Sequence, residues 1–144
     1  MRPLREFREF VEQGSVVRQS PDKHRARSLV EELGKKRAFL DYILKNTPKE
    51  EVYPNFVIDY CYDIILEYVR ARMILDGYNS DSHEAEVAYM RVLGFSNAEV
   101  RLVDELRYFR NGIKYYGKVM GWDYGKKVIS FINKIYPKLK RLVE

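Results

Sequence analysis

The sequence predicts an all-α fold, an up-and-down bundle of four to five long helices with a short additional helix at the N-terminus. Apolar residues recur at spacings of three and four along most of the chain, which is the period of a helix that packs on one side. No useful length of chain alternates apolar and polar residues, as a half-buried strand would. The turns between the helical stretches are short, and short turns favour antiparallel neighbours.

The length and composition predict one domain with a substantial core. We expect it to cover residues 1–144, with residues 1–19 as an N-terminal arm and residues 20–144 as the bundle. The net charge of +5 is spread along the chain and allows an acidic partner. A single cysteine, Cys61, rules out a disulfide framework and fits a reducing cytoplasm. No apolar run reaches the ~18 residues of a membrane span, so we expect a cytoplasmic protein without a membrane partner.

A short helix and a long helix are predicted at the start of the chain. Residues 2–13 carry apolar side chains at helical spacing and form a short amphipathic helix. A long helix to about residue 46 begins at Ser20-Pro21-Asp22, with Ser20 as the N-cap and Pro21 at the first helical position. Gly34 lies in its middle and is a possible interruption.

The next helix is the most apolar in the chain. Prolines break the chain at residues 47–54, because the residue before a proline disfavours the helical conformation. The following helix spans residues 55–76, and Gly77 ends it. Its apolar side chains occupy more than one face, which predicts the most enclosed helix of the bundle.

A polar turn, a short helix and a final long helix are predicted in the second half of the chain. Residues 78–82 form a polar turn, and Asp81 with Glu84 predicts a capping box for a helix over residues 81–93. The last helix follows a turn at residues 121–123, with Asp123 as its cap. Pro137 is expected to kink this helix or to begin a new segment.

The helix predicted over residues 96–120 carries the most chemistry. Ser96 with Glu99 forms a capping box at its start. Its apolar stripe consists of Leu102, Leu106, Phe109, Ile113, Tyr116 and Met120. A neighbouring face carries Arg107, Arg110, Asn111, Lys114 and Tyr115. Gly112, inside the helix, predicts either the close approach of another group or a bend.

The polar face of this helix suits a phosphate-bearing ligand. The forked guanidinium groups of Arg107 and Arg110 match phosphate oxygens, and Lys114 adds a point charge. Tyr108 and Tyr115 offer rings on which an unpaired base stacks. The alternative is an ordinary solvated basic face.

Other polar residues admit structural interpretations. Asp59, Asp63 and Glu67 are four residues apart, which fits either a solvated edge or carboxylates that pair with an arginine of the 96–120 helix. His24 is expected to be exposed, and His83 to cap or to pack. The sequence has no glycine-rich phosphate loop, zinc-protease motif or cysteine cluster, so we expect neither a cofactor nor a metal.

Three short motifs occur together between residues 55 and 117. An apolar helix ends in Leu75-Asp76-Gly77-Tyr78, and the next helix begins with Ser82-His83-Glu84-Ala85. The third motif is Leu106-Arg107, then Arg110-Asn111, three further residues and Tyr115. In this combination the chain resembles the HEPN (higher eukaryotes and prokaryotes nucleotide-binding) domain family.

The resemblance implies a four- or five-helix bundle, commonly a homodimer whose arginine helices face each other across a cleft. Active members of the family are metal-independent endoribonucleases, with an arginine followed after four to six residues by a histidine. Many prokaryotic members act with a minimal nucleotidyltransferase as a toxin–antitoxin pair. By position, Arg110 matches the motif arginine and Asn111 the polar residue after it.

The chain departs from this pattern at the motif histidine. Tyr115 stands at that position, and neither Tyr116 nor Gly117 supplies a histidine. A phenol with a pKa of about 10 is only ~0.1% ionised at pH 7 and is therefore a poor general base. We expect a face that binds RNA or a nucleotide without cutting it, formed by Arg107, Arg110, Asn111, Lys114 and Tyr115.

Two alternatives stay open. In the first, the chain is an endoribonuclease toxin with Arg110 and Tyr115 as catalytic candidates, or with His83 in place of the missing histidine. In the second, it is a structural protein that holds a nucleotidyltransferase or a second copy of itself. An Arg110 side chain bound to Asp63 or Glu67 within one subunit, with no cleft, would count against the binding hypothesis.

Overall fold

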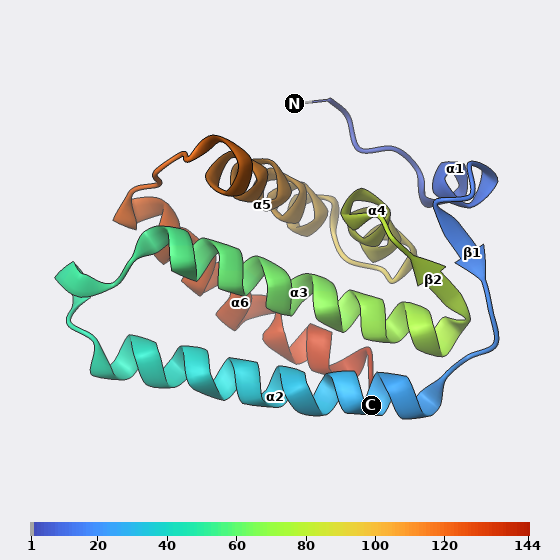
Figure 1. Ribbon diagram of the computed structural model, residues 1–144, viewed down its shortest axis with the longest axis horizontal. Coiled ribbons are helices and arrows are strands. Elements are labelled where there is room, and N and C mark those ends of the chain that lie inside the picture. Colours follow the sequence, from blue (N-terminus) through green and yellow to red (C-terminus); the bar gives the residue numbers. More distant parts are fainter. Residues whose placement is uncertain (1) are drawn as a thin grey trace.

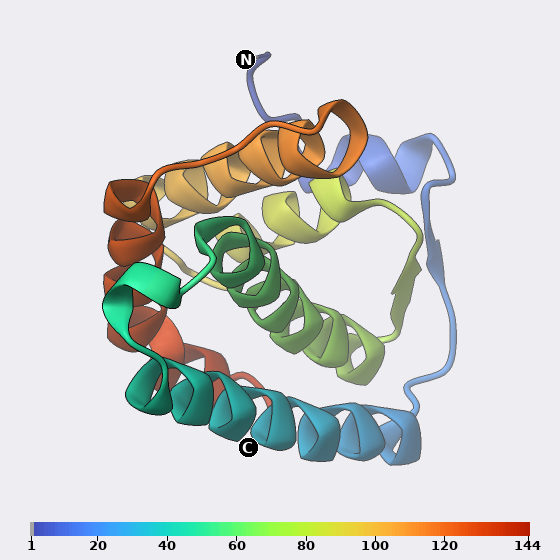
Figure 2. The ribbon, with the colours of Figure 1, turned by 60° about the vertical axis from the view of Figure 1, so that its left-hand side comes forward.

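The computed structural model describes residues 2–144 and confirms the all-α helical bundle. The helix α3 runs through the middle, with α2, α6, α5 and α4 arranged around it (Figures 1 and 2). A short 3-10 turn, Lys49–Glu51, connects α2 to α3. The helices are α1 (Phe7–Glu12), α2 (Lys23–Asn46), α3 (Pro54–Asp76), α4 (His83–Val92), α5 (Asn97–Tyr116) and α6 (Trp122–Arg141).

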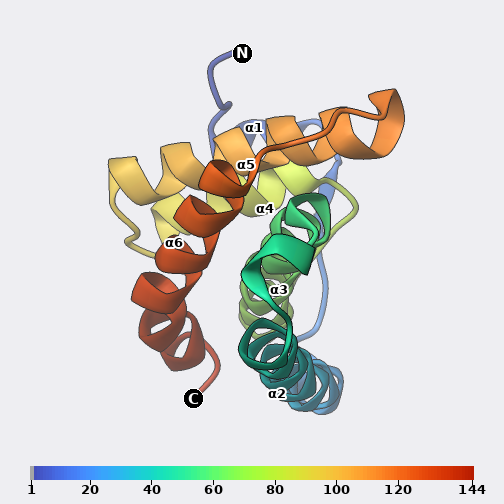
Figure 3. The ribbon, with the colours of Figure 1, turned by 90° about the vertical axis from the view of Figure 1, so that its left-hand side faces the viewer.

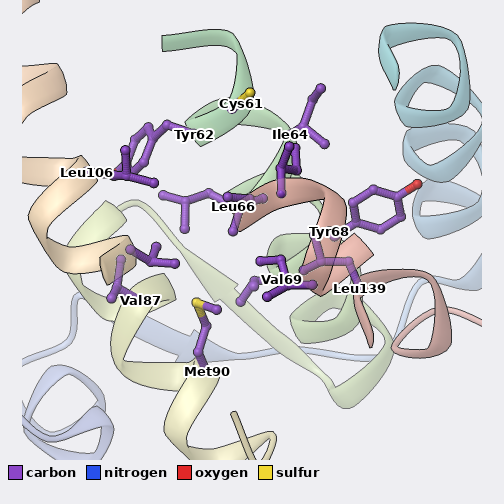
Figure 4. Close-up of a cluster of buried hydrophobic side chains, with 14 of the residues drawn as sticks. Cys61, Tyr62, Ile64, Leu66, Tyr68, Val69, Val87, Met90, Leu106 and Leu139 are labelled. Atoms are coloured by element: carbon purple, nitrogen blue, oxygen red, sulfur yellow. The ribbon is translucent and has the colours of Figure 1, made fainter. Parts of the chain in front are cut away.

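The core forms around α3, as its apolar composition predicts. Tyr62, Leu66 and Val69 of α3 lie among Met90 of α4 and Leu106 of α5, with further side chains from α6 (Figure 4). Each fully buried aliphatic side chain contributes roughly 1.5–3 kcal/mol relative to an exposed one. The prediction that residues 55–76 form the most enclosed helix is therefore confirmed.

The start of α2 differs from the sequence prediction. Asp22, not Ser20, is the N-cap, and its side chain accepts a hydrogen bond from the amide three residues on. The amide of Gln19 donates to the carbonyl of Gly77 at 2.9 Å, and the amide of Asp22 donates to the end of α3. These bonds hold residues 19–22 extended against α3, so the helix begins later. Gly34 does not interrupt α2.

Three other helices also differ from their predicted starts. The first, α1, begins at Phe7, so residues 2–6, which were predicted to be helical, lie outside it. Ser82, rather than Asp81, caps α4 through its hydroxyl. Asp123 lies in the first turn of α6 instead of capping it, because the helix already begins at Trp122. This helix runs through Pro137 without starting a new segment, since apolar residues on both sides of the proline are buried in the core.

A small antiparallel sheet joins the N-terminal arm to the bundle. Its strands are β1 (Val16–Arg18) and β2 (Tyr78–Ser80), and Val17 lies opposite Asn79. Neither strand is predicted from the sequence, because strands of three residues are too short to show alternation. Beyond β1, Phe7 of α1 packs with its ring against Tyr78 and Tyr89.

Gly77 permits this sheet, and its role can be tested. Its φ of 87° is left-handed, and an added Cβ would lie 2.9 Å from the backbone oxygen of Gln19. Gly94 has a similar φ of 88° with nothing near its missing Cβ. Both alanine variants therefore incur the left-handed penalty, but only Gly77→Ala adds a clash. We expect Gly77→Ala to lose about 1–3 kcal/mol more free energy of unfolding than Gly94→Ala in urea denaturation. Equal losses would contradict this assignment.

Candidate nucleic-acid interface on α5

The start of α5 follows its sequence signal, but its end does not. Ser96 and Glu99 form the predicted capping box, with amide-to-side-chain hydrogen bonds of 2.8 and 3.1 Å. The helix ends at Tyr116 rather than at Met120, because Gly117 adopts the left-handed conformation with a φ of 64°. Residues 117–121 therefore form a connection to α6.

Asn55, a buried residue in the first turn of α3, holds this connection. Its amide donates to the carbonyl of Lys118 at 2.9 Å and accepts from the amide of Met120 at 2.8 Å. The side chain of Lys118 then passes over Gly112, where an added Cβ would lie 3.4 Å from it. This is an ordinary contact with a flexible side chain, so the space around Gly112 does not require a glycine.

The buried side of α5 is rotated away from the predicted stripe. The residues of the helix that are buried are Val100, Val103, Asp104, Leu106 and Arg110. Of the predicted stripe, only Leu106 is fully enclosed, and Tyr116 is 86% exposed. The reason is that α5 packs against both α3 and α4, while its last turns reach beyond the neighbouring helices (Figure 3).

Arg110 lies inside this interface and not on an open face. Only 8% of the residue is exposed, its Nε donates to Asp59 at 3.1 Å, and an Nη lies 3.9 Å from Asp63. The guanidinium also lies 5.7 Å from the ring centroid of Tyr62. Burial, together with the charge of Asp59, raises the pKa of the Asp63 carboxyl, which Arg110 opposes. The hypothesis that these acids pair with an arginine of α5 is confirmed for Asp59 and Asp63. Glu67 instead pairs with Lys36 on α2, at a distance of 2.7 Å.

Arg107 instead borders a groove beside α5. Its Nε binds the buried carboxylate of Asp104 at 2.9 Å. The Nη atoms have no hydrogen-bond partner among residues 2–144. The groove has a volume of about 770 Å³. Its lining residues are Arg107, Tyr108 and Asn111 of α5, Glu84 of α4, and Arg2, Pro3 and Arg5 of the N-terminal strap, as we call residues 2–6.

The predicted site residues thus lie in three different environments. Arg107 and Asn111 share the groove, and Arg110 is buried behind them. Lys114 and Tyr115 are exposed at the projecting end of α5 and do not line the groove. Tyr115 is 67% exposed.

The contributions of the strap and of Glu84 to the groove are not predicted from the sequence. Arg5 binds both carboxylate oxygens of Glu84, with distances of 3.3 and 3.1 Å. This hydrogen bonding holds the pKa of Glu84 below its ordinary value. The only local signals were the basic residues of the arm and the acid in the first turn of α4, and neither indicates a shared groove.

The histidines occupy different environments. His24 is exposed on α2, as predicted. His83 is partly buried in the first turn of α4, and its Nδ1 lies 3.3 Å from the hydroxyl of Tyr62. Burial lowers the pKa of His83, and the nearby charges of Arg110, Arg70, Lys114 and Arg107 lower it further. The imidazole is therefore mostly neutral at pH 7.

The cysteine and the acidic side chains outside the groove offer little further reactive or metal-binding chemistry. Burial raises the pKa of the Cys61 thiol to about 12, which keeps this core side chain protonated. Within residues 2–144, histidine, cysteine and acidic side chains form no cluster of three that could hold a metal ion. Over the same residues, no helix combines the length and the apolar character needed to cross a membrane.

No family model, curated protein or solved structure matches this chain.

The environment of His83 predicts a pH dependence of stability. Well above pH 6.5 the imidazole is neutral in the folded and unfolded states alike. As the pH falls below 6.5, the unfolded chain takes up the proton first, because the folded-state pKa is lower, so stability is lost until the pH passes the folded pKa. We expect His83→Gln to reduce the fall in melting temperature between pH 7 and pH 5. His24→Gln, the matched control, should retain the full fall; identical behaviour of the two variants would contradict the prediction.

Proposed function

We propose that the groove between α5 and the N-terminal strap binds RNA or a nucleotide, and that the protein is a HEPN-like binding module without nuclease activity. The observation that carries this proposal is the meeting of Arg2, Arg5 and Arg107 around one groove with a single carboxylate, Glu84. Guanidinium groups bind phosphate oxygens through paired donors. The excess of positive charge makes a phosphate group the best-matched ligand.

The two other side chains from α5 suit a nucleotide more than a simple anion. Tyr108 is 52% exposed, so its ring is accessible for stacking with a base. Asn111 supplies an amide that both donates and accepts, as the edge of a base requires. Lys114 and Tyr115, further along the helix, extend the surface toward its projecting end.

Arg110 has a supporting role in this proposal. Its ion pair with Asp59 fixes α5 against α3, and this contact keeps Arg107 and Asn111 at the groove. The internal pairing of Arg110 counts against its use as a phosphate ligand. Arg110 does not line the groove, so the binding proposal depends on Arg107 and not on Arg110. From the HEPN resemblance, a second copy of the chain and a minimal nucleotidyltransferase remain the proposed protein partners.

The proposal predicts that Arg107→Gln weakens RNA binding. Glutamine keeps a donor for the buried Asp104 but removes the charge that faces the groove. Fluorescence anisotropy with labelled oligouridine should show weaker binding, and the slope of log Kd against log salt concentration should fall by about 1. Arg25→Gln makes the same charge change at an exposed site on α2 and should bind like the parent. Equal affinity of Arg107→Gln and Arg25→Gln would refute the proposal.

A second candidate function is a metal-independent endoribonuclease that uses His83. The observation that favours it is the histidine itself, which is mostly neutral at pH 7 and lies within the electrostatic field of Arg107 and Arg110. A neutral imidazole can accept a proton from an attacking hydroxyl. Tyr115, by contrast, is exposed at the end of α5, away from this histidine's contacts.

The two candidates make different predictions for RNA incubated with purified protein and a chelator. The binding module leaves the RNA intact on denaturing gels, and so does its His83→Gln variant. The nuclease cleaves the RNA, and His83→Gln abolishes cleavage while His24→Gln retains it. Chelator-resistant cleavage that depends on His83 would replace the binding proposal with the nuclease.

A further inference from the structure

Arg5 is held more completely than an exposed arginine usually is. Its Nε and one Nη bind the two oxygens of Glu84, and its other Nη donates to Gln13 at 3.2 Å. The guanidinium also lies 4.5 Å from the ring centroid of Phe10. A forked guanidinium bound edge-on by two oxygens is the arrangement in which arginine also binds a phosphate.

The strap that carries Arg5 lies over α4 and α5. Arg91 of α4 donates to the carbonyl of Leu4, which adds a second attachment. Arg2 and Pro3 line the groove on one side and also a second cavity of about 490 Å³ on the other, next to Arg101 of α5. The strap therefore separates the groove from the second cavity along α5, and the Arg5–Glu84 ion pair attaches the strap to α4.

We propose that the Glu84 carboxylate is an internal competitor for the ligand of the groove. In the free protein it occupies the donors of Arg5 that would otherwise bind a phosphate group. A phosphate of the bound RNA or nucleotide replaces it, and the strap then stays in place through the ligand. Glu84 is the only carboxylate that lines the groove within residues 2–144, so no other acid there competes with the ligand for Arg5.

This inference rests on the proposed function and can fail separately from it. If Glu84 merely anchors the strap, its removal loosens Arg5, and the ligand must then order a mobile arginine. Binding would be unchanged or weaker. If Glu84 competes with the ligand, its removal strengthens binding even though the strap is less firmly fastened.

The test compares Glu84→Gln with the parent chain in anisotropy titrations with labelled oligouridine. We expect Glu84→Gln to bind about two- to fivefold more tightly, the range given by the loss of one partly exposed ion pair. Glu32→Gln is the matched control, because it removes an equal charge from an exposed pair with Lys35 on α2. It should bind like the parent. The melting temperatures of both variants establish that they fold.

A second measurement monitors the Arg5–Glu84 ion pair directly. The Nε–H signal of Arg5 in ¹⁵N–¹H spectra of the parent should move when oligouridine is added, as Glu84 is replaced. Parent binding with no gain in Glu84→Gln, or with an unmoved Arg5 signal, would overturn the inference alone. No binding by either protein would overturn the proposed function and this inference together.

Discussion

The rest of the structure depends on the burial of α3. This helix is apolar around most of its circumference, so it is stable in water only when other helices cover it. The covering helices α2, α5 and α6 each bury one side, whereas α4 buries six consecutive residues, Ala85–Met90. Because Leu106 packs into the shared core, the positions of the polar residues on the rest of α5 follow from helix geometry.

Two arginines three residues apart consequently have different chemistry. Arg110 faces α3, where Asp59 accepts a hydrogen bond from its Nε and Asp63 adds a second compensating charge, and the residue is buried. Arg107 lies at the edge of the same helix, where Asp104 engages only its Nε. A buried arginine must be paired to be tolerated, whereas an arginine at an edge can keep donors for a ligand. The position of each residue on α5 therefore decides whether its guanidinium is buried against α3 or borders the groove.

The sequence predicts the helices well because their signals are local. Glycine at position 77 and the capping box at Ser96 mark helix ends through residues that lie within one turn of them. The predicted N-cap of α2 was wrong, because hydrogen bonds to the end of α3 and to Gly77 keep residues 19–22 extended. These acceptors lie far along the chain, so no local sequence pattern indicates them.

The face of α5 was also predicted incompletely, for a related reason. Periodicity assigns apolar residues to the core and polar residues to solvent, so it cannot place Asp104 or Arg110 inside. The partner that makes the burial of Arg110 tolerable, Asp59, is on another helix. The groove is still harder to predict, since Arg5 and Glu84 meet only after the arm has folded back over α4.

The small sheet has a consequence for the order in which the molecule folds. Val16 pairs with Ser80, so β1 has no partner until the whole of α2 and α3 has been placed. Contacts between residues so far apart in the chain form late, because closing a long loop costs entropy before it brings any stabilising contact. The helices can therefore assemble around α3 first, and the arm that brings Arg2 and Arg5 to the groove docks afterwards. The groove beside α5 is thus completed by a segment that is synthesised before the helices but docks after them.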